Sequence, residues 1–321
     1  MAKARKRKGR PVHGILLLDK PKGLSSNQAL QRVKWLMKAQ KAGHTGNLDP
    51  MATGMLPLCF GNATRVSAFL LDADKYYTAS VKLGERTDTA DADGEVIERL
   101  PVPELTLAVL EAVAARFIGV QQQIPPMYSA LKQGGQRLYK LARQGIEVER
   151  PPREITIYAL TELALTDDGF SFAVHCSKGT YVRVLAEDMA EALGTNGHLV
   201  ALRRDAVAGF DADLPLISPT EIERAVEVDD TEVAKPDGAD HLLHRSDLPL
   251  ADWPQAQLNA DAAWSLTHGN PVFAAEARKH DEGVLVRAYN SDDEFIGIAQ
   301  VTEDGRLAPH RIFPLPAAAE S

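Results

Sequence analysis

Stretches typical of strands and stretches typical of helices alternate irregularly along the chain, and this order restricts the fold more than any other feature. A buried strand is predicted over residues 13–18, and a helix follows it, with Ser26 as its N-cap and apolar side chains at helical spacing. Strand patterns return in pairs, among them 155–165 and 170–176, and no doubly wound pattern is present. The sequence therefore predicts an α+β fold, with a mixed, largely antiparallel sheet and flanking helices.

Composition divides the chain into three parts. Residues 1–10 form a basic tail without an apolar face, which we expect to be disordered alone and to serve either solubility or nonspecific phosphate attraction. Between about residues 211 and 250 the chain becomes acidic and is punctuated by Pro and Ser, which is typical of a domain boundary. We expect a main domain at 11–250 and a small β-rich domain at 251–315, where strand signals recur around polar turns.

The net charge of −8 argues at first against a nucleic-acid partner, because phosphate contacts require Lys and Arg. The distribution of charge reverses this argument. Residues 1–210 contain 28 Lys and Arg against 22 Asp and Glu, whereas residues 211–321 contain 8 against 22. The acidity therefore belongs to the last third of the chain.

The sequence shows no signal for a membrane or for export. The longest early apolar run, residues 14–18, is far shorter than the roughly 20 residues that cross a bilayer. The charged opening lacks the apolar stretch of a secretory signal, so we expect a cytoplasmic protein. Cys59 and Cys176 stand apart without metal-ligand spacing, and both are expected to be small buried apolar residues.

One loop concentrates unusual residues. The run GHTGNLDPMATGMLP at 43–57 places glycines on both sides of a single carboxylate, Asp49. An Asp-Pro pair alone indicates only a turn. The richness of residues 43–65 in Gly, Pro, Thr and Asn predicts an ordered loop with short elements at best, and such loops often carry function on a rigid scaffold.

Three further motifs accompany this loop in order along the chain. They are KYYT with GERTDTADADG within 75–94, PPMYSALK at 125–132, and SKGTYVR at 177–183. Together the four motifs resemble the TruB family of pseudouridine synthases over about residues 13–210. The segment LTHGNPV at 266–272 resembles, less specifically, the small PUA-like RNA-binding domain that ends bacterial members of this family.

The resemblance implies a function and a set of site residues. It implies a catalytic domain at 11–250 that isomerises uridine 55 in the T-loop of tRNA to pseudouridine, with the base flipped out of its stack. In the family pattern, Asp49 is the nucleophile, Tyr77 is the active-site tyrosine and Arg183 is the arginine partner of the aspartate. The positions implied to bind the substrate are His44, Tyr181, Leu202, Lys20 and Lys22.

These residue types suit the reaction. The bond from a uracil nitrogen to the ribose breaks, the base turns, and a ring carbon takes the place of the nitrogen, so no cofactor is expected. A carboxylate can act as the nucleophile toward either the ribose or the uracil. A guanidinium beside Asp49 would keep that carboxylate ionised and orient both oxygens. A tyrosine ring can replace lost stacking, worth about 1–3 kcal/mol per base, and its phenol can take part in proton transfer.

Ordinary alternatives stay open for the supporting residues. Seen alone, His44 would be a loop histidine that satisfies backbone groups, and Arg183 would be a surface or phosphate-binding arginine. The remaining alternatives are core packing for Tyr77, Tyr181 and Leu202 and a solvated turn for Lys20 and Lys22.

An acidic run at Asp88, Asp91, Asp93 and Glu95 invites a calcium or magnesium interpretation, since both ions prefer oxygen ligands. The run lacks the spaced terminal Glu of an EF-hand loop. We therefore interpret it as a polar turn and expect no metal.

The leading hypothesis is a stand-alone, monomeric enzyme that recognises the T-loop of tRNA mainly by shape and splayed bases. One alternative is a guide-RNA-dependent relative that acts on ribosomal RNA with partner proteins. The other is a noncatalytic RNA-binding or tRNA-folding protein that uses the same groove.

Overall fold

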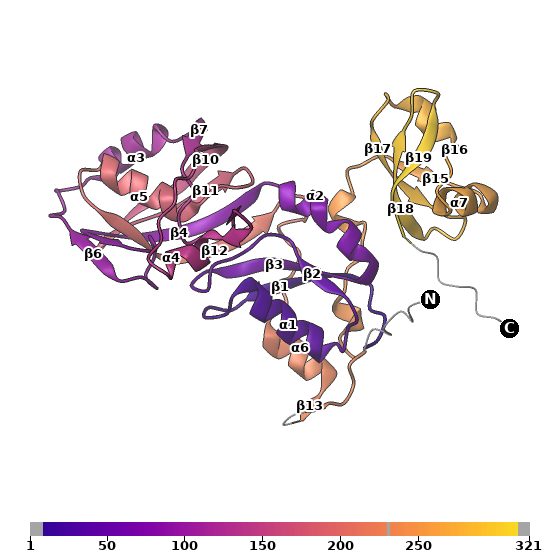
Figure 1. Cartoon of the computed structure of the whole chain (residues 1–321), viewed down its shortest axis with the longest axis horizontal. Coiled ribbons are helices and arrows are strands. Elements are labelled where there is room, and N and C mark those ends of the chain that lie inside the picture. The colour runs from indigo at the N-terminus through magenta and orange to yellow at the C-terminus, as the bar shows by residue number, and fades with distance from the viewer. Residues whose placement is uncertain (1–8, 230–231, 314–321) are drawn as a thin grey trace.

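The computed structural model describes residues 9–229 and 232–313, and these form two sheets that lie apart (Figure 1). The larger sheet has eight strands in the order β1-β3-β12-β4-β11-β10-β7, and β2 pairs with β3 beside this path. The strands are β1 (Gly14–Lys20), β2 (Ala42–His44), β3 (Thr53–Phe60), β4 (Lys75–Leu83), β7 (Gly119–Gln123), β10 (Arg153–Thr166), β11 (Gly169–Cys176) and β12 (Gly197–Val207). Only the β3–β12 pair of this sheet is parallel, so the predicted mixed, largely antiparallel sheet is confirmed.

Helices pack against this sheet and shield its apolar side chains (Figure 1). The α-helices of the described chain are α1 (Ser26–Leu36), α2 (Ser67–Asp72), α3 (Leu107–Ala115), α4 (Leu138–Ala142), α5 (Val182–Ala192), α6 (Pro219–Val226) and α7 (Ala260–Thr267). The 3-10 helices are η1 (Gly61–Arg65), η2 (Asp240–Leu242), η3 (Leu248–Leu250) and η4 (Ala275–Lys279). Helix α5 packs on β12 and β4, α3 packs on β10, and α1 contacts α6 and β2.

Short hairpins project from the larger sheet. They are β5 (Glu85–Thr87) with β6 (Val96–Arg99), β8 (Lys132–Gln133) with β9 (Gln136–Arg137), and β13 (Val228–Asp229) with β14 (Glu232–Val233). The first two hairpins lie in the segments between β4 and β10 and therefore belong to the same part of the molecule as the sequence motifs.

The smaller sheet has its own apolar core. Its strands are β15 (Gln255–Gln257), β16 (Val272–Phe273), β17 (Leu285–Tyr289), β18 (Phe295–Val301) and β19 (Arg306–Ile312), in the order β15-β17-β18-β19-β16. Leu266 of α7 is fully buried against this sheet, together with Val286 and Leu307. The two parts of the molecule meet where Phe69 of α2 packs edge-on against Trp253, with ring centroids 5.0 Å apart.

Residues 43–65 do not form a loop with short elements only, because residues 53–60 make the eight-residue strand β3. The run from Met55 to Phe60 is buried on both faces, so it lacks the polar–apolar alternation that marks a half-exposed strand. Pro57 is tolerated because its carbonyl accepts from Thr45 N at 3.2 Å, while β2 ends at His44 and requires no donor from it.

The N-cap of α1 is Ser25, one residue before the predicted Ser26. The Ser25 side chain accepts from the Gln28 amide, and the Gln28 side chain accepts from the Ser25 amide, which completes a capping box. Ser26 is instead a buried residue of the first turn.

Cys59 and Cys176 are buried free thiols, as expected. Among the described residues, no helix combines the length and apolar character that a bilayer crossing requires. The basic tail at 1–10 lies outside the described residues except for Gly9 and Arg10.

Candidate active site

The geometry is built around an ion pair between Asp49 and Arg183. Asp49 lies in the connection from β2 to β3, and Arg183 is the second residue of α5. The Arg183 Nε lies 2.8 Å from Asp49 Oδ2. The Arg183 side chain is 4% exposed, whereas that of Asp49 is 36% exposed. The guanidinium is therefore fixed in the interior, and the carboxylate that it orients still reaches solvent.

The remaining nitrogens of Arg183 are also occupied. Nη1 donates to the Thr89 carbonyl at 2.6 Å, and Nη2 donates to the Tyr128 carbonyl at 2.8 Å. Because the planar fork has a partner in each direction, the side chain cannot rotate without breaking charge-assisted hydrogen bonds. Arg183, in the fourth sequence motif, thus contacts one residue from each of the other three motifs.

A second carboxylate, Asp91, faces the same guanidinium, with its Oδ2 3.7 Å from Arg183 Nε. Asp91 is 5% exposed and accepts from Thr89 Oγ1 at 2.6 Å and from the Asp93 amide at 3.1 Å. Burial raises the pKa of Asp91, while Thr89 and Arg183 oppose this rise. The acidic run is a polar turn, as interpreted, but Asp91 within it is buried and faces Arg183. The Thr-x-Asp-x-Asp spacing signals a carboxylate held by its own turn, but only the fold brings it to Arg183.

Tyr77 lies on β4, where it packs against the main core and pairs across strands with Val174 of β11 and Arg204 of β12. Burial raises the pKa of the Tyr77 phenol, and the positive charge of Arg204 lowers it. Cys176 and Asp49 raise the pKa of Tyr77 further. The phenol is therefore neutral at pH 7 and lies within electrostatic reach of the Asp49 carboxylate.

The segments on either side of Asp49 are anchored from α1 and β1. Ser26 Oγ donates to the Leu48 carbonyl at 3.0 Å and accepts from the Leu48 amide at 2.7 Å. On the other side, Lys20 Nζ donates to the carbonyls of Pro50 at 3.4 Å and of Leu24 at 2.7 Å. Burial, partly opposed by Asp49, lowers the pKa of Lys20 to about 8.

Lys20 is fully buried, which disagrees with its predicted role as a phosphate contact. Its ammonium group is held by backbone carbonyls and would have to leave them to reach a phosphate. The pattern Lys-Pro-Lys gave no sign that the first lysine points inward. Lys22, by contrast, is exposed and remains available for an RNA backbone.

The other residues predicted to bind the substrate are His44, Tyr181 and Leu202. His44 ends β2, and its buried Nδ1 has no hydrogen-bond partner within the described residues. Burial lowers the pKa of His44, so the neutral ring is favoured at pH 7. Tyr181 caps α5, and its amide donates to Gln123 Oε1 at 2.8 Å. Leu202 is 7% exposed on β12, beside Ala79 of β4.

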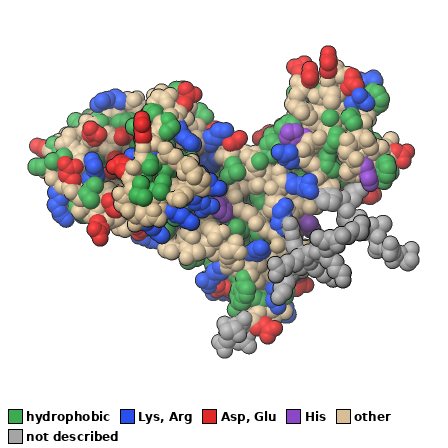
Figure 2. Space-filling view, viewed as in Figure 1, with side chains coloured by type: hydrophobic (Ala, Val, Ile, Leu, Met, Phe, Trp, Pro, Cys, Tyr) green, Lys and Arg blue, Asp and Glu red, His purple; other side chains and the backbone are tan. Residues whose placement is uncertain are grey.

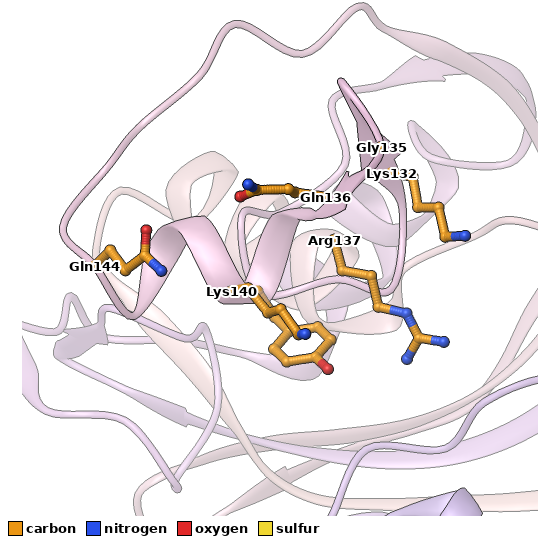
Figure 3. A pocket seen from close by; sticks show the side chains of 7 residues that line it. Lys132, Gly135, Gln136, Arg137, Lys140 and Gln144 are labelled. Atoms are coloured by element: carbon orange, nitrogen blue, oxygen red, sulfur yellow. The ribbon is translucent and has the colours of Figure 1, made fainter.

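A basic hollow lies in the segment that follows Tyr128. It has a volume of about 600 Å³, and Figure 3 shows the side chains of Lys132, Arg137 and Lys140 around it, on and near α4. Figure 2 shows further Lys and Arg side chains gathered across the middle of the molecule, beside the lobe that contains α3 and α5. Sequence patterns did not distinguish Arg137 and Lys140, because only their arrangement in space separates them from other surface charges. No cluster of three or more potential metal ligands is present in residues 9–229 and 232–313.

The site thus combines Tyr77, on a central strand of the mixed sheet, with an accessible aspartate that a buried arginine holds. Solved structures share this fold. The chain is similar to a protein in the crystal structure of a Cbf5-Nop10-Gar1 complex, with a TM-score of 0.68 at 22% identity, covering 98% of this chain and 92% of that one.

The sequence comparisons are more specific. Residues 34–182 match the model of the TruB family pseudouridylate synthase (N terminal domain), and residues 254–313 match that of pseudouridine synthase II TruB, C-terminal. The chain is 49% identical to tRNA pseudouridine synthase B of Nitrosococcus oceani over 97% of this chain and 98% of that protein. It is 50% identical to tRNA pseudouridine synthase B of Stutzerimonas stutzeri over 96% and 97%. The chain belongs to the TruB family of pseudouridine synthases and is an isomerase.

Proposed function

We propose that this protein converts uridine 55 in the T-loop of tRNA to pseudouridine, acting as a cytoplasmic monomer on a base that is flipped out of its stack. The observation that carries the proposal is the Asp49–Arg183 pair, in which a buried guanidinium holds an accessible carboxylate at 2.8 Å. The tRNA substrate is supported by relatives about half identical in sequence, whose name specifies tRNA. A flipped base costs a few kcal/mol, which the site must recover.

The proposed roles follow from position. Asp49 acts as the nucleophile, because among the described residues it alone joins exposure to a buried cationic partner. Arg183 orients this carboxylate and keeps it ionised. Tyr77 stacks on the extruded uracil and provides the hydroxyl for proton transfer when the ring carbon loses its hydrogen.

The binding roles rest on exposure and chemistry. His44 contacts the RNA with its half-buried side chain, Tyr181 and Leu202 shape the uracil pocket, and Lys22 contacts the phosphate backbone. Lys20 instead supports the loop that holds Asp49, which replaces the phosphate contact predicted for it.

The domain division is proposed as expected from the sequence. Residues 11–250 are the catalytic unit, and residues 251–315 are a PUA-like unit that makes a local RNA contact. The basic hollow at Lys132, Arg137 and Lys140 extends the RNA surface of the catalytic unit.

Incubation of the purified chain with unmodified tRNA, followed by mapping of pseudouridine, tests the proposal. Product at position 55, formed without any added RNA or protein, is expected, and it excludes the guide-RNA-dependent alternative. Absence of product, or product elsewhere, would overturn the proposal.

Asp49→Asn separates catalysis from binding. Retained tRNA affinity with complete loss of product is expected, because the amide is isosteric but not nucleophilic. Asp205→Asn is the matched control, since Asp205 binds Thr78 Oγ1 on the exposed side of β4. Persistent product formation by Asp49→Asn would remove Asp49 from the nucleophile role and favour a site elsewhere.

A further inference from the structure

The guanidinium of Arg204 lies directly beneath the site. Arg204 is on β12 and is 1% exposed, which makes it one of the largest fully buried side chains in the described chain. A buried cation requires partners, because its transfer from water costs several kcal/mol. Within the described residues, however, Arg204 has no carboxylate partner within 4.0 Å, in contrast to its neighbour Arg203, which pairs with Asp19 at 3.0 Å. Stability alone gives no reason to bury this charge.

The hydrogen bonds of Arg204 join the two ends of the Asp49 loop. Nε donates to the Met55 carbonyl at 2.7 Å, and Nη1 approaches the Asn47 carbonyl at 3.4 Å. Its backbone pairs with Gly54, where an added Cβ would come within 2.2 Å of the Arg204 carbonyl. Asp49 therefore lies in a loop that is clamped both before and after it by one side chain.

The third nitrogen of Arg204 is unused. Its Nη2 is buried and has no hydrogen-bond partner within the described residues. On the opposite side of β12 from β3, the cross-strand neighbour of Arg204 is Tyr77. Neighbouring side chains at paired positions of antiparallel strands lie about 5 Å apart at Cβ. The positive charge of Arg204 lowers the pKa of the Tyr77 phenol, so the guanidinium is a neighbour of this hydroxyl. An unsatisfied buried donor costs about 1–3 kcal/mol, which is the kind of strain kept at working sites.

We infer that Arg204 is a positioning residue of the isomerisation: it holds the Asp49 loop at both ends and, through Nη2, sets the direction of the Tyr77 hydroxyl. The inference rests on the proposed function, because Arg204 would position the two side chains, Asp49 and Tyr77, that are proposed to carry out the reaction. Arg204 touches neither Asp49 directly nor the exposed face of the loop, so its effect is on the geometry of the reacting groups and not on tRNA binding.

Single-turnover rates and tRNA dissociation constants of Arg204→Gln and Arg204→Lys test this inference. The Gln variant keeps a shorter polar side chain without the charge and should lower the single-turnover rate about 100-fold while tRNA affinity stays within about threefold. The Lys variant restores the charge without the fork and should recover about tenfold of that loss. Arg203→Gln, one residue away on the opposite face, is the control and should retain the wild-type rate.

The outcomes separate this inference from the proposed function. Lack of product with the wild-type protein would overturn the proposed function itself. Wild-type activity in Arg204→Gln would overturn only the inference. If both Arg204 variants lose tRNA affinity and thermal stability in parallel with activity, Arg204 is a structural residue of the sheet, and the positioning role is wrong.

Discussion

The pKa values of carboxyl groups are raised beside the active site and lowered on the C-terminal sheet. On α5, burial raises the pKa of Glu187 to about 7 and that of Asp188 to about 6. On the turn between β18 and β19, a hydrogen bond from Arg306 lowers the pKa of Asp304 to about 2. Burial near the site therefore disfavours the charged form of these carboxyl groups. On the C-terminal sheet, Asp304 lies in water and its charged form is favoured.

The difference follows from what each region must bury. The C-terminal sheet closes mainly over apolar side chains, and the buried carboxylate beside it, Asp247, accepts a hydrogen bond from Tyr289 at 2.6 Å. The catalytic region buries Arg183 and Arg204, and carboxylates must follow Arg183 inward, because an unpaired buried charge is strongly destabilising. Buried charges, which cost stability, therefore lie in the region of the proposed chemistry. Substitutions that remove a charge from each region test this contrast.

Removal of the Arg183 charge should have the largest effect. Arg183→Met leaves Asp49 and Asp91 without their cation and frees the carbonyls of Thr89 and Tyr128. We expect the rate of pseudouridine formation to fall by on the order of 10³. Urea unfolding should show a loss of about 3 kcal/mol in the free energy of unfolding.

Arg306→Met is the counterpart in the other region. Its ion pair with Asp304 is exposed, so we expect no measurable change in the urea midpoint or in the rate. Equal destabilisation by the two substitutions would contradict the comparison.

The sequence was sufficient for most elements of the fold but not for the network around Arg183. Helix α1 was predicted because its apolar residues recur at helical spacing and a serine lies near its start. Strand β3 was missed, because a strand buried on both faces has no alternation and Pro57 suggests a loop.

In the site, the roles of Asp49 and Arg183 were predicted by family motifs, and their meeting at 2.8 Å is a product of the fold. Asp91, Arg204 and the inward direction of Lys20 could not be predicted in the same way. Their roles depend on which side of a strand or turn faces a distant cation, and single-sequence patterns do not encode contacts of that range.

Removal of the second carboxylate should have a smaller effect on the rate. Asp91→Asn keeps the hydrogen bond from Thr89 but removes one of the two negative charges that face Arg183. We expect the single-turnover rate to fall about tenfold to a hundredfold, since the guanidinium then shifts toward Asp49 and alters its orientation. Asp93→Asn, on the same turn, should keep the wild-type rate, and a rate loss as large as that of Asp91→Asn would show that the turn and not the charge is responsible.

The stability of the catalytic region should fall as pH rises from about 4.5 to 7. The folded protein binds a proton at Glu187 up to a pKa of about 7, whereas the usual value near 4.5 applies in the unfolded chain. The folded state therefore binds more protons in this window, and each rise in pH weakens it. Glu187→Gln should reduce this slope, leaving the part that Asp188 contributes up to its pKa of about 6, and should stabilise the protein at pH 8 by about 1 to 2 kcal/mol, a figure reduced for partial exposure. Urea unfolding at pH 5 and pH 8 measures the difference, and Glu191→Gln, an exposed position on the same helix, should retain the slope.

Removal of the Asp304 charge should have the smallest effect and the opposite sign. Because its folded pKa of about 2 lies below the unfolded value, its contribution to stability is present above about pH 4 and is lost as pH falls toward 2. Asp304→Asn should therefore match the wild-type protein in activity at all pH values at which the enzyme is folded. In thermal melts it should be slightly less stable than the wild-type protein above about pH 4, and the two should converge as pH falls toward 2. A rate change in this variant would mean that a charge on the C-terminal sheet affects the reaction at the active site. The two regions would then differ in the exposure of their charges but not in their influence on the rate.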